Sequence, residues 1–130
     1  MSAQTLLSGG DKWFSYSGVL FGDVSVPATI QMIFIPNTGL RDSYIKLEPY
    51  FEQLVSGASG AALGVEVKID DVTVIKARQF YHGSSSNISG AGAESYNLFV
   101  PRQSKLEVLS LNTSANNTQT RGANIIGYYL

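Results

Sequence analysis

The strictest alternation of apolar and polar positions lies in residues 63–80, LGVEVKIDDVTVIKARQF. Val65, Val67 and Ile69 alternate with charged residues, and a second apolar run follows the aspartate pair Asp70–Asp71. A period of two with many β-branched residues is typical of a strand with one buried face, and a short polar break between two such runs is typical of a β-hairpin. The pattern therefore predicts a hairpin that places Val65, Val67 and Ile69 in the core. Because a lone hairpin is marginally stable in water, other strands must cover this face.

Shorter apolar runs, separated by Gly, Ser, Pro and Asn, supply the other strands. Ala28–Ile35 is apolar for most of its length, which predicts a central strand buried on both sides, with Ile33 in the core. In Ser43–Phe51 the alternation places Ile45 and Leu47 inward, whereas Pro49 predicts an edge strand or a bulge because it has no N–H. Further strands are expected at Gln4–Leu7, Lys12–Tyr16, Val19–Phe21, Tyr96–Val100, Ser104–Asn112 and Ala123–Leu130, and polar turns at Ser8–Asp11 and Thr113–Arg121.

About eight or nine short strands, without an amphipathic helix longer than about one turn, indicate an all-β fold. The strand count favours an antiparallel β-sandwich of the jelly-roll type, with an immunoglobulin-like sandwich as the second choice. At 130 residues the length predicts one domain over residues 1–130. We expect a short N-terminal segment, residues 1–11, to take part in assembly contacts.

Two segments rich in Gly and Ser, Ser56–Ala62 and His82–Glu94, flank the hairpin. Segments of this composition bury too little apolar area to offset the backbone entropy lost on ordering, which favours loops that become ordered on a partner. In Ser104–Asn112 both faces carry apolar residues, which predicts a core on one side and a neighbour on the other. The final Tyr128–Tyr129–Leu130 predicts an end that is held in a sheet or an interface.

Composition narrows the expected partners. Charged residues make up 15% of the chain and the net charge is −1, against roughly 25% charged residues in typical soluble domains. Without a basic cluster, nucleic acid is not an expected partner. Cysteine is absent, which excludes disulfides and thiolate zinc sites. The sequence shows neither a signal-peptide pattern nor an apolar run of about 18 residues, so we expect synthesis in the cytoplasm and no membrane partner.

Few residues offer catalytic or metal chemistry. Asp70–Asp71 could bind Ca²⁺ if more oxygen ligands converged, but a tight turn explains the pair more simply. Glu48 and Glu52 could form a glycosidase pair, and His82, the sole histidine, is the only base available to a Ser–His–acid triad. Solvated acids and a polar strand end are the simpler interpretations. The sequence therefore predicts no catalytic residues, no metal site and no cofactor.

The aromatic residues are more informative than the acids. The chain has seven tyrosines, more than one small core needs, and a buried tyrosine requires a partner for its hydroxyl group. Tyr and Trp are enriched at protein interfaces, and their rings can stack on the apolar faces of sugars. The candidate interface or stacking residues are Trp13, Tyr44, Tyr50, Tyr81, Tyr128 and Tyr129.

Three stretches, IPNTGLRDSYIKLEPYF, GVEVKIDDVTVIKA and RGANIIGYYL, resemble small all-β virion proteins of tailed bacteriophages. The resemblance is greatest to the capsid decoration, or cement, proteins on the outside of the head. It implies a jelly roll or related β-sandwich that assembles as a dimer or trimer on the major capsid protein. It also implies that the protein stiffens the shell against internal DNA pressure and has no catalytic activity.

The leading functional hypothesis is therefore a non-enzymatic structural protein of the virion, made in the host cytoplasm. Its expected partners are its own copies, as a dimer or trimer, and the major capsid protein. The second hypothesis is a carbohydrate-binding or receptor-binding jelly-roll module, with Trp13, Tyr44, Tyr50 or Tyr81 as the stacking platform. A small hydrolase that uses His82 or the Glu48 and Glu52 pair is third.

Overall fold

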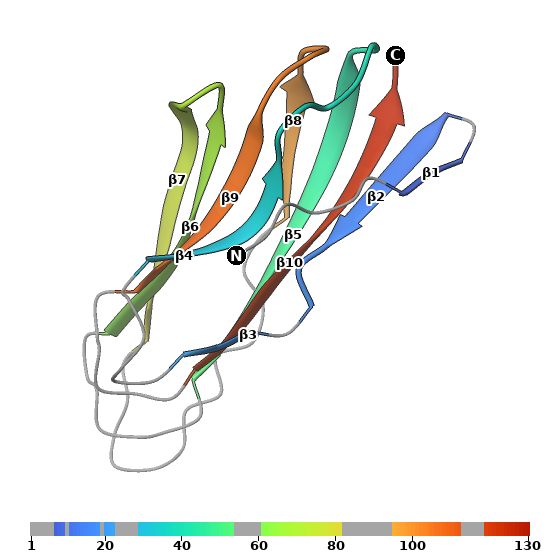
Figure 1. The fold of residues 1–130 in the computed structure, drawn as a ribbon. Coiled ribbons are helices and arrows are strands. Elements are labelled where there is room, and N and C mark those ends of the chain that lie inside the picture. Colours follow the sequence, from blue (N-terminus) through green and yellow to red (C-terminus); the bar gives the residue numbers. More distant parts are fainter. Residues whose placement is uncertain are drawn as a thin grey trace.

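A computed structural model describes the backbone of residues 7–9, 11–18, 20–22, 29–53, 61–81, 95–112 and 119–130, and the side chains of residues 11–18, 20, 29–50, 64–77, 95–111 and 121–130. These residues form ten strands in two antiparallel sheets (Figure 1). The described part of the chain contains no helix with the length and hydropathy needed to cross a lipid bilayer.

The larger sheet has six strands and the smaller sheet has four. The six-stranded sheet has the order β1–β2–β10–β5–β8, with β3 also paired to β10. Its strands are β1 (Leu7–Gly9), β2 (Lys12–Tyr16), β3 (Leu20–Gly22), β5 (Ser43–Gln53), β8 (Tyr96–Val100) and β10 (Gln119–Tyr129). The four-stranded sheet has the order β4–β9–β6–β7 and consists of β4 (Thr29–Ile35), β6 (Ala61–Ile69), β7 (Val72–Tyr81) and β9 (Leu106–Asn112).

The strands pair in a nested order along the chain. β6 pairs with β7, β5 with β8, β4 with β9 and β2 with β10, and successive pairs alternate between the two sheets. The chain thus resembles one long hairpin, with β6–β7 at its tip, rolled up into two layers, which is the jelly-roll arrangement. The prediction of an all-β, jelly-roll-like sandwich is confirmed. The described residues form ten strands, where about eight or nine were expected: eight belong to the nested pairs, and the short β1 and β3 are the other two.

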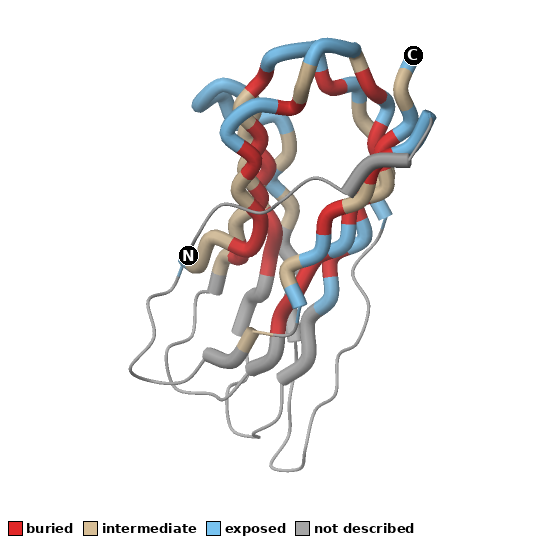
Figure 2. Tube along the Cα trace, turned by 45° about the vertical axis from the view of Figure 1, so that its right-hand side comes forward, coloured by how far each residue is buried: buried red, intermediate tan, exposed pale blue. Residues whose placement is uncertain are grey.

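The core lies between the two sheets, where the buried residues of both layers face each other (Figure 2). Of the six residues expected there, five are buried and one is partly buried. Val65, Val67, Ile33, Ile45 and Leu47 are buried, and Ile69 packs partly buried against them.

Trp13 is completely buried in this core, so the expectation that it stacks on a partner is wrong. Its indole covers the backbone of Gly127 on the neighbouring strand β10, and its Nε1 donates a hydrogen bond to the Ser43 Oγ on β5 at 3.0 Å. A Cβ atom at position 127 would lie only 2.0–2.5 Å from three indole atoms. Trp13 therefore ties three adjacent strands together, and only glycine fits beneath it.

β4 lies at the edge of its sheet in the described structure, so the expectation of a central strand is wrong. Met32 and Ile33 are nevertheless both completely buried. The register of β4 against β9 shifts between Gln31 and Ile33, which marks a β-bulge. A bulge turns two successive side chains toward one face, so its apolar run mimics a strand that is buried on both sides.

β5 lies inside its sheet, between β10 and β8, although it contains Pro49. The expectation of an edge strand or bulge is wrong for a local reason. Pro49 stands opposite Ala123, whose carbonyl accepts from the Ser17 N–H at 3.0 Å and whose N–H donates to the Ser17 Oγ at 2.8 Å. Ala123 thus directs its backbone groups toward Ser17 and not toward Pro49. On the other side of β5, the pairing with β8 extends only as far as Leu47. None of the described neighbours requires the missing N–H of Pro49.

The hairpin tip is a two-residue turn, as the sequence predicts. Asp70 and Asp71 have φ angles of 48° and 68°, and positive φ at both central residues is the requirement of a type I′ hairpin turn. Asp70 also holds the start of β9, because its N–H donates to the Lys105 carbonyl at 2.9 Å and its carboxylate accepts from the Lys105 N–H at 2.8 Å. Asp71 forms an ion pair with the Lys105 ammonium group, whose pKa is raised mainly by that hydrogen bond.

Asp71→Gly is expected to raise the free energy of unfolding by about 0.5–1 kcal/mol in urea titrations. Glycine removes the cost of a left-handed non-glycine residue, about 1–2 kcal/mol, whereas the lost ion pair with Lys105 is exposed and screened by solvent, so it offsets only part of this gain. The matched control is Asp70→Gly, which gains the same conformational freedom but loses the carboxylate bond to Lys105. Asp70→Gly should be neutral or destabilising, and an equal gain for both variants would contradict this account of the turn.

Arg121 on β10 is buried between the two sheets, with 1% of its surface exposed. The predicted polar turn Thr113–Arg121 is wrong at this end, because β10 begins at Gln119; residues 113–118 lie outside the described residues. The Arg121 Nη1 donates to the Ser110 Oγ on β9 at 2.8 Å, and the Nε has no hydrogen-bond partner in the described structure. Burial lowers the pKa of this guanidinium. No acidic side chain of the described residues forms an ion pair with it.

Candidate functional site

The outer surface of the six-stranded sheet carries all five aromatic side chains that are exposed in the described part of the chain. Alternation along the strands separates this surface from the core: in β2, for example, Trp13 and Ser15 are buried, whereas Tyr16 is exposed. The five side chains have exposed fractions between 37% and 49%. They are Tyr16, Tyr44, Tyr50, Phe99 and Tyr128, and we call them the aromatic face.

The register of the sheet places these residues in rows. Tyr128 on β10 lies opposite Tyr44 on β5, and Tyr44 lies opposite Phe99 on β8. Side chains directly opposite each other on antiparallel strands have Cβ atoms about 4.5–5.5 Å apart. Lys12 on β2 extends the row, with its Nζ 5.6 Å from the centre of the Tyr128 ring. A continuous aromatic strip therefore crosses the sheet at this level.

The charges on this surface are balanced within it. The Lys46 Nζ lies 2.9 Å from the Glu48 Oε1, and this hydrogen bond raises the pKa of the lysine above its ordinary value. Lys12 is associated with the Tyr128 ring, a cation–π contact that contributes about 0.5–1 kcal/mol at exposed sites. These two lysines do not form a cluster that could bind a phosphate backbone. The surface suits an uncharged partner better than a strongly charged one.

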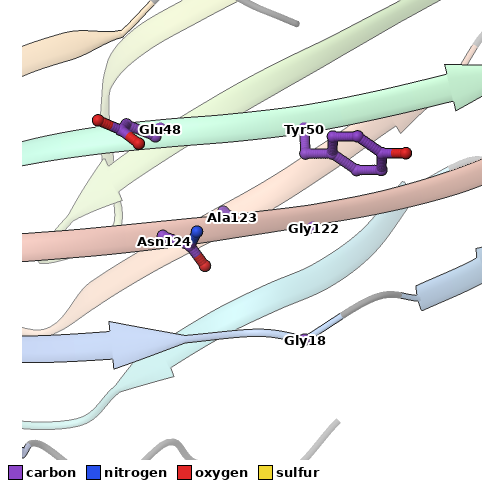
Figure 3. Close-up of a pocket in the computed structure, with 6 residues that line it drawn as sticks. All are labelled: Gly18, Glu48, Tyr50, Gly122, Ala123 and Asn124. Atoms are coloured by element: carbon purple, nitrogen blue, oxygen red, sulfur yellow. The ribbon is translucent and has the colours of Figure 1, made fainter. Parts of the chain in front are cut away.

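A small hollow lies beside the aromatic face. It is found where the strand pairing along one side of β10 is interrupted, between β2 and β3. β2 and β3 both pair with β10, and Ser17–Gly18 lies between them. A Cβ at Gly122 would lie 2.5 Å from the Gly18 carbonyl oxygen, so glycine allows this close approach. The hollow has a volume of about 260 Å³. We call it the Gly122 hollow, and it is lined by Gly18, Glu48, Tyr50, Gly122, Ala123 and Asn124 (Figure 3).

The candidate residues from the sequence fall into different environments. Tyr44, Tyr50 and Tyr128 lie on the aromatic face. Tyr129 instead packs partly buried against the core, and the Arg41 guanidinium lies over its ring at 4.9 Å. The side chain of Tyr81 lies outside the described residues.

Two members of the aromatic face, Tyr16 and Phe99, are absent from the sequence candidates. Alternation in KWFSY, with Trp13 and Ser15 buried, was the available signal for Tyr16.

The last described residues, which the sequence predicts to be held in a sheet or an interface, are held in the sheet: the Leu130 N–H donates to the Asp42 carbonyl at 3.0 Å.

The candidate catalytic groups do not assemble in the described structure. Glu48 and Glu52 lie on the same strand, β5, four residues apart. Their Cα atoms are therefore about 13 Å apart along one strand, whereas the two acids of a glycosidase flank the scissile bond. His82 lies outside the described residues. Among the described side chains, no group of three or more His, Cys, Asp or Glu residues could hold a metal ion.

The geometry above defines a jelly roll with an aromatic outer sheet surface, and comparison with solved structures gives the same fold class. No protein-family model and no curated protein sequence matches the chain. The VP2 subviral particle of infectious bursal disease virus is similar, with 14% identity and a TM-score of 0.50 over 91% of this chain and 33% of that chain. The Gx strain of the same virus gives 12% identity and a TM-score of 0.53 over 91% of this chain and 32% of that chain.

A bacterial structure also shares the fold. Dimeric latent PorU from Porphyromonas gingivalis has 11% identity and a TM-score of 0.53, over 98% of this chain and 13% of that chain. This chain thus spans about a third of the viral chains and a smaller part of PorU. At these identities the similarity shows the fold, which a protein of a virus particle and a bacterial protein share, and the fold alone does not assign a function.

Proposed function

We propose that the chain is a non-enzymatic structural protein of a viral capsid. In its more specific form, the proposal is a decoration protein that stabilises the shell of a tailed bacteriophage through contacts with its own copies and with the major capsid protein. The observation that carries the proposal is the aromatic face, presented on a jelly roll of the kind found in a virus particle. Contiguous exposed apolar patches mark interaction sites, and tyrosine is enriched at interfaces.

The aromatic face suits association with further copies of the chain. Tyr44, Tyr128 and Phe99 form a row of broad, rigid side chains that lose little conformational entropy when they are buried. The nearby charges of Lys46 and Glu48 are of both signs, so a second copy meets no net repulsion. We assign additional contacts to the N-terminal segment, residues 1–11, to Ser56–Ala62, whose last two residues belong to β6, and to His82–Glu94. Residues 1–6, 10, 54–60 and 82–94 lie outside the described residues.

Sedimentation velocity of the purified protein is expected to show a dimer or trimer, and the protein should cosediment with capsid shells that lack it. The double variant Tyr44→Ser, Tyr128→Ser should weaken self-association roughly 30-fold, because two interface tyrosines that contribute about 1 kcal/mol each together account for about 2 kcal/mol. The matched control is Val72→Ser, Val74→Ser, two exposed apolar residues on β7 outside the aromatic face. A monomer that does not bind shells, or equal effects of both double variants, would refute the proposal.

A further inference from the structure

We infer that the Gly122 hollow binds one ring of a neutral saccharide, an activity that goes beyond the proposed structural role and does not require it, although Tyr50 belongs both to the hollow and to the aromatic face. The break between β2 and β3 borders the hollow, and Gly122 allows the Gly18 backbone to approach β10 closely at this break. Its volume of about 260 Å³ lies just below the roughly 300–1,000 Å³ of pockets that hold drug-sized ligands. This size fits a single ring.

The polar groups of the hollow match the hydroxyl groups of a sugar. Glu48 and Asn124 lie opposite each other on β5 and β10, so their side chains leave the sheet side by side. The carboxylate is an acceptor, whereas the amide both donates and accepts, which allows the pair to bind two neighbouring hydroxyl groups. Lys46 occupies the Oε1 of Glu48 and leaves the other carboxylate oxygen for a ligand.

The rim of the hollow supplies the apolar part of sugar recognition. Tyr50 lines one wall (Figure 3). Tyr16 on β2 lies opposite Asn124, and its ring stacks with that of Phe14 at a centroid distance of 6.4 Å and an interplanar angle of 8°. The C–H faces of a sugar ring pack on such aromatic surfaces while its hydroxyl groups bind polar side chains. Aromatic and hydrogen-bonding groups thus border the same hollow.

Other ligand classes fit this hollow less well. Among the described residues that line it, Glu48 is the only charged one, and its ion pair with Lys46 leaves no excess positive charge to bind a phosphate or another anion. No group of acidic and histidine side chains able to hold a metal ion exists among the described residues, so a cation held by several ligands has no site here. A long apolar ligand would cover the second carboxylate oxygen of Glu48, which does not contact Lys46, without offering it a hydrogen bond, and this is unfavourable. A neutral ligand with many hydroxyl groups avoids these penalties.

The test is a titration of the ¹⁵N-labelled full chain with methyl glycosides of glucose, galactose, mannose and N-acetylglucosamine, followed by amide chemical-shift changes. At least one glycoside should shift the amides of Gly18, Gly122 and Asn124 with a dissociation constant near the millimolar range, as expected for one ring. Asn124→Ala and Glu48→Gln should each weaken binding at least tenfold. The control Asn97→Ala removes an exposed amide from β8 of the same sheet, outside the hollow, and should leave binding unchanged.

Two results would overturn the inference: no glycoside shifts these amides at 50-fold molar excess, or Asn124→Ala and Asn97→Ala weaken binding equally. Either result leaves the proposed structural role intact, because self-association is measured separately and depends on Tyr44 and Tyr128. Conversely, a Tyr44→Ser, Tyr128→Ser variant that is monomeric should still bind the glycoside.

Discussion

Gly127→Ala is expected to lower the free energy of unfolding by about 3 kcal/mol, at the upper end of the usual cost of overpacking a core. The new methyl group would overlap the indole of Trp13, so either the ring or β10 must move. A displaced ring would also lose the hydrogen bond from its Nε1 to Ser43. A decrease in the free energy of unfolding is informative, because alanine in a strand is otherwise favoured over glycine by roughly 0.5–1 kcal/mol. Urea unfolding followed by tryptophan fluorescence measures the change.

The control for this prediction is Gly127→Ala in a variant that has a smaller side chain at position 13. In a Trp13→Leu background, Gly127→Ala should cost much less, because leucine lacks the ring atoms that lie over position 127. Circular dichroism replaces fluorescence as the probe, since Trp13 is the only tryptophan. An equal cost in both backgrounds would show that Gly127 is needed for some reason other than the indole.

Arg121→Met is expected to raise the free energy of unfolding by about 2 kcal/mol. Arg121 is buried with one hydrogen bond to Ser110, and its Nε has no partner in the described structure. No acid of the described residues pairs with this buried charge, so its lost hydration is not compensated there, and replacing buried ionic groups by apolar side chains of similar volume is often neutral or stabilising by about 1–4 kcal/mol. Methionine is long and flexible enough to fill the space.

Ser110→Ala provides the matched test. In the native background it removes the hydrogen bond to the guanidinium and should lower the free energy of unfolding by about 1–3 kcal/mol. In the Arg121→Met background the same change should be nearly neutral, because no donor remains to be satisfied. Loss of stability in Arg121→Met, comparable with truncation of a core residue, would show that the guanidinium makes more favourable interactions than this geometry indicates.

Much of the fold follows from local patterns in the sequence. The alternation in β6 and β5 correctly places Val65, Val67, Ile45 and Leu47 inward, and the aspartate pair correctly predicts the hairpin turn. These predictions succeed because the face of a strand on which a side chain lies, and the type of a turn, depend on residues that are neighbours in the sequence. They need no knowledge of which strands pair.

The errors arise where pairing between distant segments decides the outcome. Pro49 is tolerated inside the sheet because Ala123, far along the chain, turns its backbone toward Ser17. Arg121 reads as part of a polar turn, yet it is buried because β10 continues through it. The aromatic face was only partly predictable for the same reason. Residue type indicates Tyr44, Tyr50 and Tyr128, but only the register shows that Phe99 joins their row.

The nested pairing of the strands also dictates an order of folding. β6 and β7 are joined by two residues and can pair at once, whereas β2 and β10 come from opposite ends of the described chain. Closing long loops costs more entropy, and folds dominated by distant pairings form slowly. During synthesis, β10 leaves the ribosome after the nine other described strands, so the place of Tyr128 beside Tyr44 stays empty while those strands emerge. A nascent chain that has not yet released β10 therefore lacks the complete aromatic face.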